Sequence, residues 1–240
     1  MENSTDFSDP ARRIIVALDV SEQEDLVRLV KTLRGSVGMF KVGKELFCSM
    51  GPDAVRIVQD HGGEVFLDLK FHDIPNTVAG AVRSSCKLGV SMFTVHASGG
   101  EAMMKAACEQ ARSCAGAPLV IAVTVLTSLD DKDLAMVGLD GPAEKAAVRL
   151  GRMAINCGLD GLVASPKELR ALRSELGKSP FLVTPGIRPS GYLADDQQRI
   201  ATPKEAVVNG ADFLVIGRPI TKAKDPLEAV DAIANDLVQD

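Results

Sequence analysis

EVFLDLKFHDIPNT (residues 64–77) begins as an apolar run of strand length and ends in three charged residues, Asp68, Lys70 and Asp73. Near-continuous apolar residues are typical of parallel strands that are buried on both faces. Because side chains alternate along a strand, Asp68 and Lys70 share one face and the aliphatic residues beside them share the other. A buried charge is costly unless it is paired. The stretch therefore predicts a buried strand whose end carries either a charged site or an ion-pair network.

The same kind of segment recurs along the chain. Between the apolar runs lie segments in which apolar residues have helical spacing. Strands and helices that alternate eight times predict an α/β fold, a single-domain (β/α)8 TIM barrel. A doubly wound open sheet is the alternative, but the turn after the first run lacks the glycines of a dinucleotide-binding loop. The other runs are RIIVALDV (13–20), MFKVGK (39–44), SMFTVHA (91–97), PLVIAVTVL (118–126), DGLVAS (160–165), PFLVTPGI (180–187) and DFLVIGRPI (212–220).

Several helix starts carry capping signals. SPKE (165–168) and TPKE (202–205) each offer a hydroxyl cap, proline at the first helical position and glutamate at the third. Ser21 and Glu24 have capping-box spacing, and Asp225 precedes a proline in the same way. These signals predict where four of the helices begin.

Composition limits the class of protein. The chain has 240 residues, enough for one large domain, and its net charge of −5 argues against non-specific nucleic-acid binding. No apolar run is long enough to span a membrane, and the polar start has no signal-peptide core. The five cysteines are scattered without a CxxC pair, which predicts reduced thiols and no zinc site. We therefore expect a cytoplasmic protein with a flexible segment at 1–12 and one catalytic barrel at 13–240.

Charged residues gather at the predicted carboxyl ends of three consecutive strands, where barrel enzymes place their catalytic groups. They are Asp19, then Lys41, then Asp68 with Lys70, and Asp73 follows in the next loop. Carboxylates and ammonium groups that alternate in a cluster keep one another ionised. A lysine held in this way can donate a proton, and its carboxylate neighbours repel an anion bound beside them. An ion-pair network that closes the barrel mouth is the alternative, but four such residues at three strand ends favour a site.

Glycine and arginine occur together at the ends of the last two strands, in TPGIRP (184–189) and VIGRPI (215–220). Loops at these two places form the phosphate site of many such barrels, because glycine leaves backbone N–H groups accessible. An arginine adds a charge-assisted contact to the phosphate. The pair of motifs predicts a phosphate-binding end of the site.

Other candidates carry a weaker signal. His96 ends the fourth strand and could hold a metal with nearby carboxylates, but the lysines among them would compete with a cation. Thr127 could hydrogen-bond a polar ring, and Gln197 could close over a ligand. The two residues lie in the longest irregular stretches, 127–141 and 188–201, which are candidate lids.

The motifs together resemble the orotidine 5′-phosphate decarboxylase family over about residues 13–235. The D-x-K-x-x-D core alone is shared with related sugar-phosphate barrels, whereas its combination with the other motifs is specific. The elements that carry the resemblance are LDV (18–20), KVGKELF (41–47), DLKFHDIPNT (68–77), VHASGG (95–100), AVTVLTS (122–128), TPGIRP (184–189) and VIGRPI (215–220).

The resemblance implies decarboxylation of orotidine 5′-phosphate to UMP, the last step of pyrimidine nucleotide synthesis, without a metal or an organic cofactor. It also implies a homodimer in which Asp73, Ile74 and Thr77 reach into the partner's site. Two other classes remain open. One is a magnesium-dependent sugar-phosphate decarboxylase or aldolase of the same barrel superfamily, and the other is a non-catalytic sensor of a phosphorylated ligand.

Residue roles follow from the same resemblance. Lys70 is expected to protonate C6 of the pyrimidine, and Asp68 to lie against the substrate carboxylate. Lys41 and Asp73 complete the alternating network. The expected binding residues are Asp19 and Lys41 for the ribose, Thr127 for the pyrimidine with Ser128 left open beside it, Pro185 in the pocket wall, and Arg188, Gln197, Gly217 and Arg218 for the phosphate.

Overall fold

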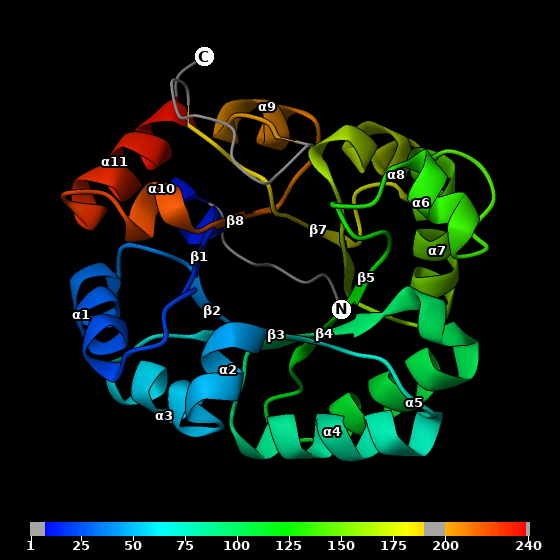
Figure 1. The fold of residues 1–240 in the computed structure, drawn as a ribbon, viewed down its shortest axis with the longest axis horizontal. Coiled ribbons are helices and arrows are strands. Elements are labelled where there is room, and N and C mark those ends of the chain that lie inside the picture. The colour runs from blue at the N-terminus through cyan, green and yellow to red at the C-terminus, as the bar shows by residue number, and fades with distance from the viewer. Residues whose placement is uncertain (1–7, 190–199, 239–240) are drawn as a thin grey trace.

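Eight parallel strands close into a barrel in chain order, with helices around it (Figure 1). This computed structural model describes residues 8–189 and 200–238. Each strand lies inside one of the eight apolar runs, so the predicted (β/α)8 barrel is confirmed. The strands are β1 (Ile14–Ala17), β2 (Met39–Gly43), β3 (Val65–Phe71), β4 (Met92–His96), β5 (Leu119–Val123), β6 (Gly161–Val163), β7 (Phe181–Thr184) and β8 (Phe213–Ile216).

The helices follow the strands in the expected alternation. The α-helices are α1 (Gln23–Leu33), α2 (Lys44–Met50), α3 (Asp53–Asp60), α4 (Pro75–Lys87), α5 (Gly100–Arg112), α6 (Asp131–Met136), α7 (Ala143–Asn156), α8 (Leu169–Leu176), α9 (Pro203–Val208), α10 (Arg218–Thr221) and α11 (Pro226–Asp236). The 3₁₀ helices are η1 (Pro10–Arg13), η2 (Ala97–Gly99) and η3 (Pro166–Glu168). None of these helices has the length and apolar character needed to cross a membrane.

Two local predictions need correction. The stretch 127–141, expected to be irregular, contains α6, because Asp130 and Asp133 cap its start reciprocally and so stabilise a helix too short to show clear periodicity. The cap predicted at Ser21 is wrong. Glu22 occupies the N-cap of α1, and the Ser21 hydroxyl lies 3.3 Å from the Glu22 carboxylate instead of reaching a helix N–H. The other predicted caps are present: Ser165 with Glu168, Thr202 with Glu205, and Asp225.

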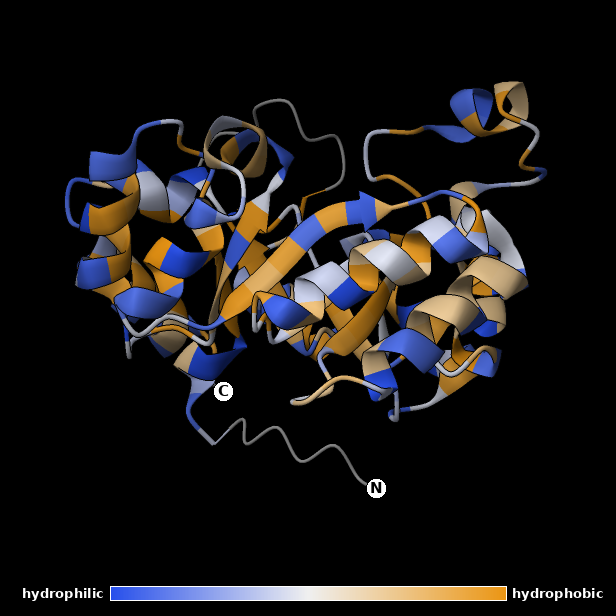
Figure 2. Ribbon diagram, turned by 90° about the horizontal axis from the view of Figure 1, so that it is seen from below, coloured by the Kyte–Doolittle hydropathy of each residue, from blue (hydrophilic) through white to orange (hydrophobic). Residues whose placement is uncertain are grey.

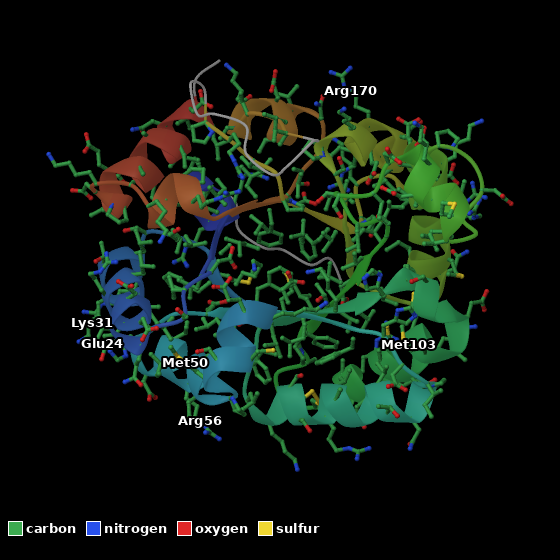
Figure 3. All side chains as sticks on the ribbon, in the orientation of Figure 1. Glu24, Lys31, Met50, Arg56, Met103 and Arg170 are labelled. Carbon is green, nitrogen blue, oxygen red and sulfur yellow. A yellow bond between two sulfur atoms is a disulfide. The ribbon has the colours of Figure 1, made fainter. Side chains whose placement is uncertain are left out.

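The strands separate two apolar layers. Phe66 of β3 points into the barrel with residues of the other strands, whereas Val65 and Leu67 pack outward against the helices. Figure 2 shows strands that are mainly hydrophobic and helices in which hydrophilic and hydrophobic residues are mixed. Charged side chains such as Arg56 and Arg170 extend outward from the ring (Figure 3). The alternation predicted for β3 is therefore confirmed. It carries Asp68 and Lys70 onto the inner face, at the carboxyl end of the barrel.

Cys86 and Cys114 form a disulfide, so the prediction that all five thiols are reduced is wrong for this pair. Cys86 belongs to α4 and Cys114 follows α5, and the packing of these two helices brings the Cα atoms to 6.1 Å. Their separation of 28 residues in the sequence gave no sign of this contact. Cys48, Cys108 and Cys157 are free.

Candidate active site

Two residues of β3 form an ion pair at the mouth of the barrel. The ammonium Nζ of Lys70 lies 2.7 Å from Oδ2 of Asp68. The backbone of Lys70 has a φ of 56°, a left-handed conformation that residues other than glycine rarely adopt. The pairing register between β3 and β4 shifts at the same place, between Leu67 and Phe71. Backbone strain of this kind is typical of functional sites, where the surrounding structure holds it in place.

The ion pair extends across two further strands. Lys41 on β2 places its Nζ 3.2 Å from Oδ1 of Asp19, which follows β1, and 4.0 Å from Oδ2 of Asp68. Asp19, Lys41, Asp68 and Lys70 thus form a row of alternating charges, which we call the charged row. The sequence predicted these four groups at one rim, and the structure brings them together there.

Asp68 is the most deeply buried carboxylate of the charged row. Burial by itself raises the pKa of Asp68, but the positive charges of Lys70 and Lys41 oppose this, as do hydrogen bonds from Lys70 and Thr94. The opposing effects prevail, so the pKa of Asp68 lies below its ordinary value. Asp68 is therefore a fixed negative charge at neutral pH, directly beside the side chain of Lys70.

The charged row borders a cavity of about 480 Å³, a size typical of small-molecule sites. Its floor is the uppermost layer of the barrel core, which shields one side of the charges from water and strengthens their interactions. The apolar residues that line this cavity include Ala17, Phe66, Val123, Val163, Val183 and Val215. Thr127 and Pro185 also line it, as the sequence analysis expected of binding residues.

The residues that follow β7 and β8 give the cavity a cationic end. Arg188, Gly217 and Arg218 line it, as predicted from the two late Gly-Arg motifs. Arg188 is only 6% exposed, and its Nη1 donates to the Ile187 carbonyl at 2.9 Å. Its buried Nε has no hydrogen-bond partner among residues 8–189 and 200–238. Buried donors are almost always satisfied, so this end of the cavity is suited to an anion.

Three predicted site residues among those that the structure describes do not line this cavity. Asp73, Ile74 and Thr77 lie at the start of α4, outside the lining. The carboxylate of Asp73 accepts from the Ile74 N–H at 2.6 Å, and the Ile74 residue is 66% exposed. Gln197 lies outside the described residues.

His96 lies behind the charged row and does not line the cavity. Burial, then the positive charges of His72, Lys70 and Lys44, lower the pKa of His96 to about 4, although Asp68 opposes this. The ring of His72 lies 5.5 Å away, centroid to centroid. Among the described residues, no three His, Cys, Asp or Glu side chains are grouped so as to hold a metal ion.

The chain matches the model of the orotidine 5′-phosphate decarboxylase / HUMPS family over residues 12–233. The chain belongs to this family. An orotidine 5′-phosphate decarboxylase of Syntrophotalea carbinolica is 51% identical over 231 residues, which cover 94% of this chain and 95% of the relative. The enzyme of the same name from Moorella thermoacetica is 52% identical, covering 94% of this chain and 92% of the relative. The enzyme class that the sequence predicted is therefore confirmed.

Solved structures of the decarboxylase / HUMPS family agree in fold. The crystal structure of orotidine 5′-phosphate decarboxylase from Lactobacillus acidophilus superposes with a TM-score of 0.83 at 38% identity, and the match covers 95% of this chain and all of that one. The enzyme from Pyrococcus horikoshii gives a TM-score of 0.77 at 26% identity. The barrel is thus shared by relatives whose sequences differ from this chain at most positions.

Three residues in or beside the cavity were not predicted from the sequence. Thr94 is fully buried and bonds to Asp68, and the signal was a polar residue inside the apolar run SMFTVHA. A Cβ on Gly43 would lie 2.7 Å from Nζ of Lys41, so glycine leaves room for the charged row. Lys222, four residues after Arg218, lines the cationic end.

Proposed function

We propose that the chain converts orotidine 5′-phosphate to UMP in this cavity, and so supplies pyrimidine nucleotides. The observation that carries the proposal is a single cavity lined by the charged row, by apolar residues of the barrel core and by the cationic end. The reaction needs a place for a ring carboxylate, a proton donor beside it and a separate site for a phosphate. The lining of the cavity offers residues suited to all three.

The proposed reaction balances with this chain's own groups. The bond between C6 and the carboxylate breaks, its electron pair stays on C6, and carbon dioxide leaves. A proton then moves from the Lys70 ammonium to C6, and Lys70 regains a proton from water. The carbanion at C6 has no adjacent carbonyl to accept its charge, so fixed charges must stabilise it. Lys70 supplies a positive charge beside C6, held by its 2.7 Å contact with Asp68.

Asp68 has two roles in this proposal. Its negative charge pairs with Lys70 and holds the Lys70 side chain in place, and it lies against the substrate carboxylate, whose repulsion is relieved when carbon dioxide leaves. Lys41 offsets part of the charge of Asp68 from a distance of 4.0 Å. Lys41 and Asp19 would also bind the ribose hydroxyls, and their 3.2 Å ion pair at the rim supports that role.

The remaining contacts are assigned by position. Thr127 and Pro185 line the same cavity and would contact the pyrimidine ring. Arg188, Gly217 and Arg218 would bind the phosphate. The Nε of Arg188, which has no hydrogen-bond partner within the described part of the chain, supports this assignment. Phosphate binding far from the reacting carbon can hold the carboxylate against Asp68. Gln197 remains a predicted phosphate ligand.

A homodimer with shared sites is part of the proposal. Asp73, Ile74 and Thr77 lie outside their own chain's cavity, and Ile74 exposes a large apolar side chain. A second chain would cover Ile74 and could receive Asp73 beside the Lys70 ammonium. Asp73 would then add a third carboxylate to the Asp19 and Asp68 that each chain provides itself.

The test is ultraviolet absorbance of orotidine 5′-phosphate with purified protein after exhaustive chelator treatment. We expect rapid loss of the orotate chromophore and formation of UMP at an undiminished rate. Activity that disappears with chelator and returns with Mg²⁺ would favour the metal-dependent sugar-phosphate barrels. Binding of UMP without any turnover would favour a sensor.

A further inference from the structure

Thr94 is a buried polar residue with two partners in the charged row. It lies in the middle of β4, is fully buried, and shares the inward face of that strand with Met92 and His96. Its hydroxyl donates to Oδ1 of Asp68 at 2.9 Å. The same oxygen accepts from the backbone N–H of Lys70, also at 2.9 Å.

The two bonds act on different degrees of freedom. Oδ2 of Asp68 faces the lysines, at 2.7 Å from Lys70 and 4.0 Å from Lys41, so the bond from Thr94 to Oδ1 fixes the rotation of the carboxylate. The bond from Lys70 N–H holds the strained backbone at the point where φ is 56°. One hydroxyl thereby couples the carboxylate to the backbone of the lysine that pairs with it.

We propose that Thr94 is a positioning residue that fixes the Asp68 carboxylate and the Lys70 backbone together, so that the Lys70 ammonium points at the reacting carbon. The inference rests on the proposed function. Thr94 itself does not line the cavity and so has no contact with substrate. It acts only through Asp68 and Lys70.

The informative variant is Thr94→Val, which keeps the shape of the side chain but removes its hydroxyl. It leaves Oδ1 of Asp68 and the N–H of Lys70 without their partner. Losing a hydrogen bond to a charged group and displacing a catalytic group both slow the reaction strongly. We therefore expect kcat to fall about 10- to 100-fold. KM should change much less, because the phosphate contacts are untouched.

Two variants act as controls. Thr94→Ser keeps the hydroxyl in a smaller side chain and should recover most of the lost kcat. Thr124→Val removes another buried hydroxyl, which donates a hydrogen bond to the Val163 carbonyl at 3.1 Å. Thr124 does not line the cavity. The Thr124→Val variant should behave like the wild type. If Thr94→Ser is as impaired as Thr94→Val, the hydroxyl is not responsible and the inference is overturned.

The pH profile separates positioning from simple loss of structure. The titratable groups that face Asp68 are Lys41 from β2, Lys70 from its own strand and His96 from β4. Losing a hydrogen bond that favours the carboxylate raises the pKa of Asp68. Activity requires the carboxylate, so the acid limb of kcat/KM should move to higher pH in Thr94→Val and stay in place in Thr124→Val. A uniform loss at all pH values would overturn the inference.

A measurement without turnover makes the outcome independent of the proposed function. Carbon-13 NMR titration of the Asp68 carboxyl, assigned with an Asp68→Asn spectrum, should show a higher pKa in Thr94→Val than in the wild type. An unchanged pKa would overturn the role of Thr94 even if the wild type proved inactive. Failure of the wild-type protein to decarboxylate orotidine 5′-phosphate would instead reject the proposed function alone.

Discussion

Lys70 combines an unfavourable backbone with a favourable side-chain environment. A left-handed φ costs a residue with a side chain roughly 1–3 kcal/mol, and such strain persists only where neighbouring contacts hold it. Here the contacts are the ion pair with Asp68 and the bond from Lys70 N–H to Thr94. The backbone at Lys70 is therefore locally destabilising, and it places one ammonium group at the barrel mouth.

Replacing Lys70 by alanine should abolish turnover while leaving the barrel intact. Transfer of a proton by a positioned acid contributes roughly 10²–10⁴-fold, and the charge beside the carbanion adds to this, so kcat should fall by at least about three powers of ten. The measurement is decarboxylation followed by absorbance, together with a thermal melt and UMP binding. Lys31→Ala, on the exposed outer face of α1 (Figure 3), is the matched control. A Lys70→Ala enzyme with near-normal turnover would rule out the proposed role.

At the scale of elements, the sequence predicted well wherever one residue pattern determines one structure. The alternation along β3 and the strand order predicted the inward direction of Asp68 and Lys70. Lys41 was placed correctly because parallel strands all end at one rim. These inferences need only the period of a strand and the direction of the chain.

The elements that were mispredicted depend on contacts between distant segments or on exact helix starts. The Cys86–Cys114 disulfide requires α4 and α5 to pack side by side, which no local pattern shows. Thr94 gains its role only because β4 lies next to β3 with a shifted register. The N-cap predicted at Ser21 lies one residue before the observed N-cap, Glu22, which is within the usual error of helix boundaries. Local spacing could not have settled any of these points.

The residue at the end of α10 provides a further test. Lys222 lines the cavity with Arg188 and Arg218, and within the described residues it has no ion pair. Lys222→Gln should lower kcat/KM for the phosphorylated substrate by roughly 3- to 10-fold, because an exposed cation near a phosphate contributes modestly. The loss should shrink at high salt, where the charge is screened.

The matched control is Lys224→Gln, which removes an exposed lysine two residues further on and outside the cavity lining. Inhibition constants add a second readout. Lys222→Gln should weaken inhibition by UMP but not by uridine, which lacks the phosphate. Equal effects on both inhibitors would show that Lys222 does not act on the phosphate.

At the scale of the whole molecule, the proposed dimer would add Asp73 of a second chain to the charged row. Asp73 and Ile74 lie at the start of α4, and neither lines the cavity of its own chain. If a second copy supplies Asp73, activity per chain should fall on dilution as dimers dissociate. Dilution alone does not identify the residue that crosses the interface.

Mixing two inactive variants identifies that residue directly. Dimers of Lys70→Ala and Asp73→Ala chains, allowed to exchange subunits, would contain one site with its own Lys70 and the partner's Asp73 intact. Random exchange at equal amounts makes half of the dimers mixed, so about a quarter of wild-type activity should return. A mixture of Lys70→Ala with Lys41→Ala is the control, because both residues come from the same chain and every site stays defective. No recovery in the Asp73 mixture would mean that Asp73 serves its own chain, and recovery in the control would mean that Lys70 and Lys41 do not serve one site from the same chain.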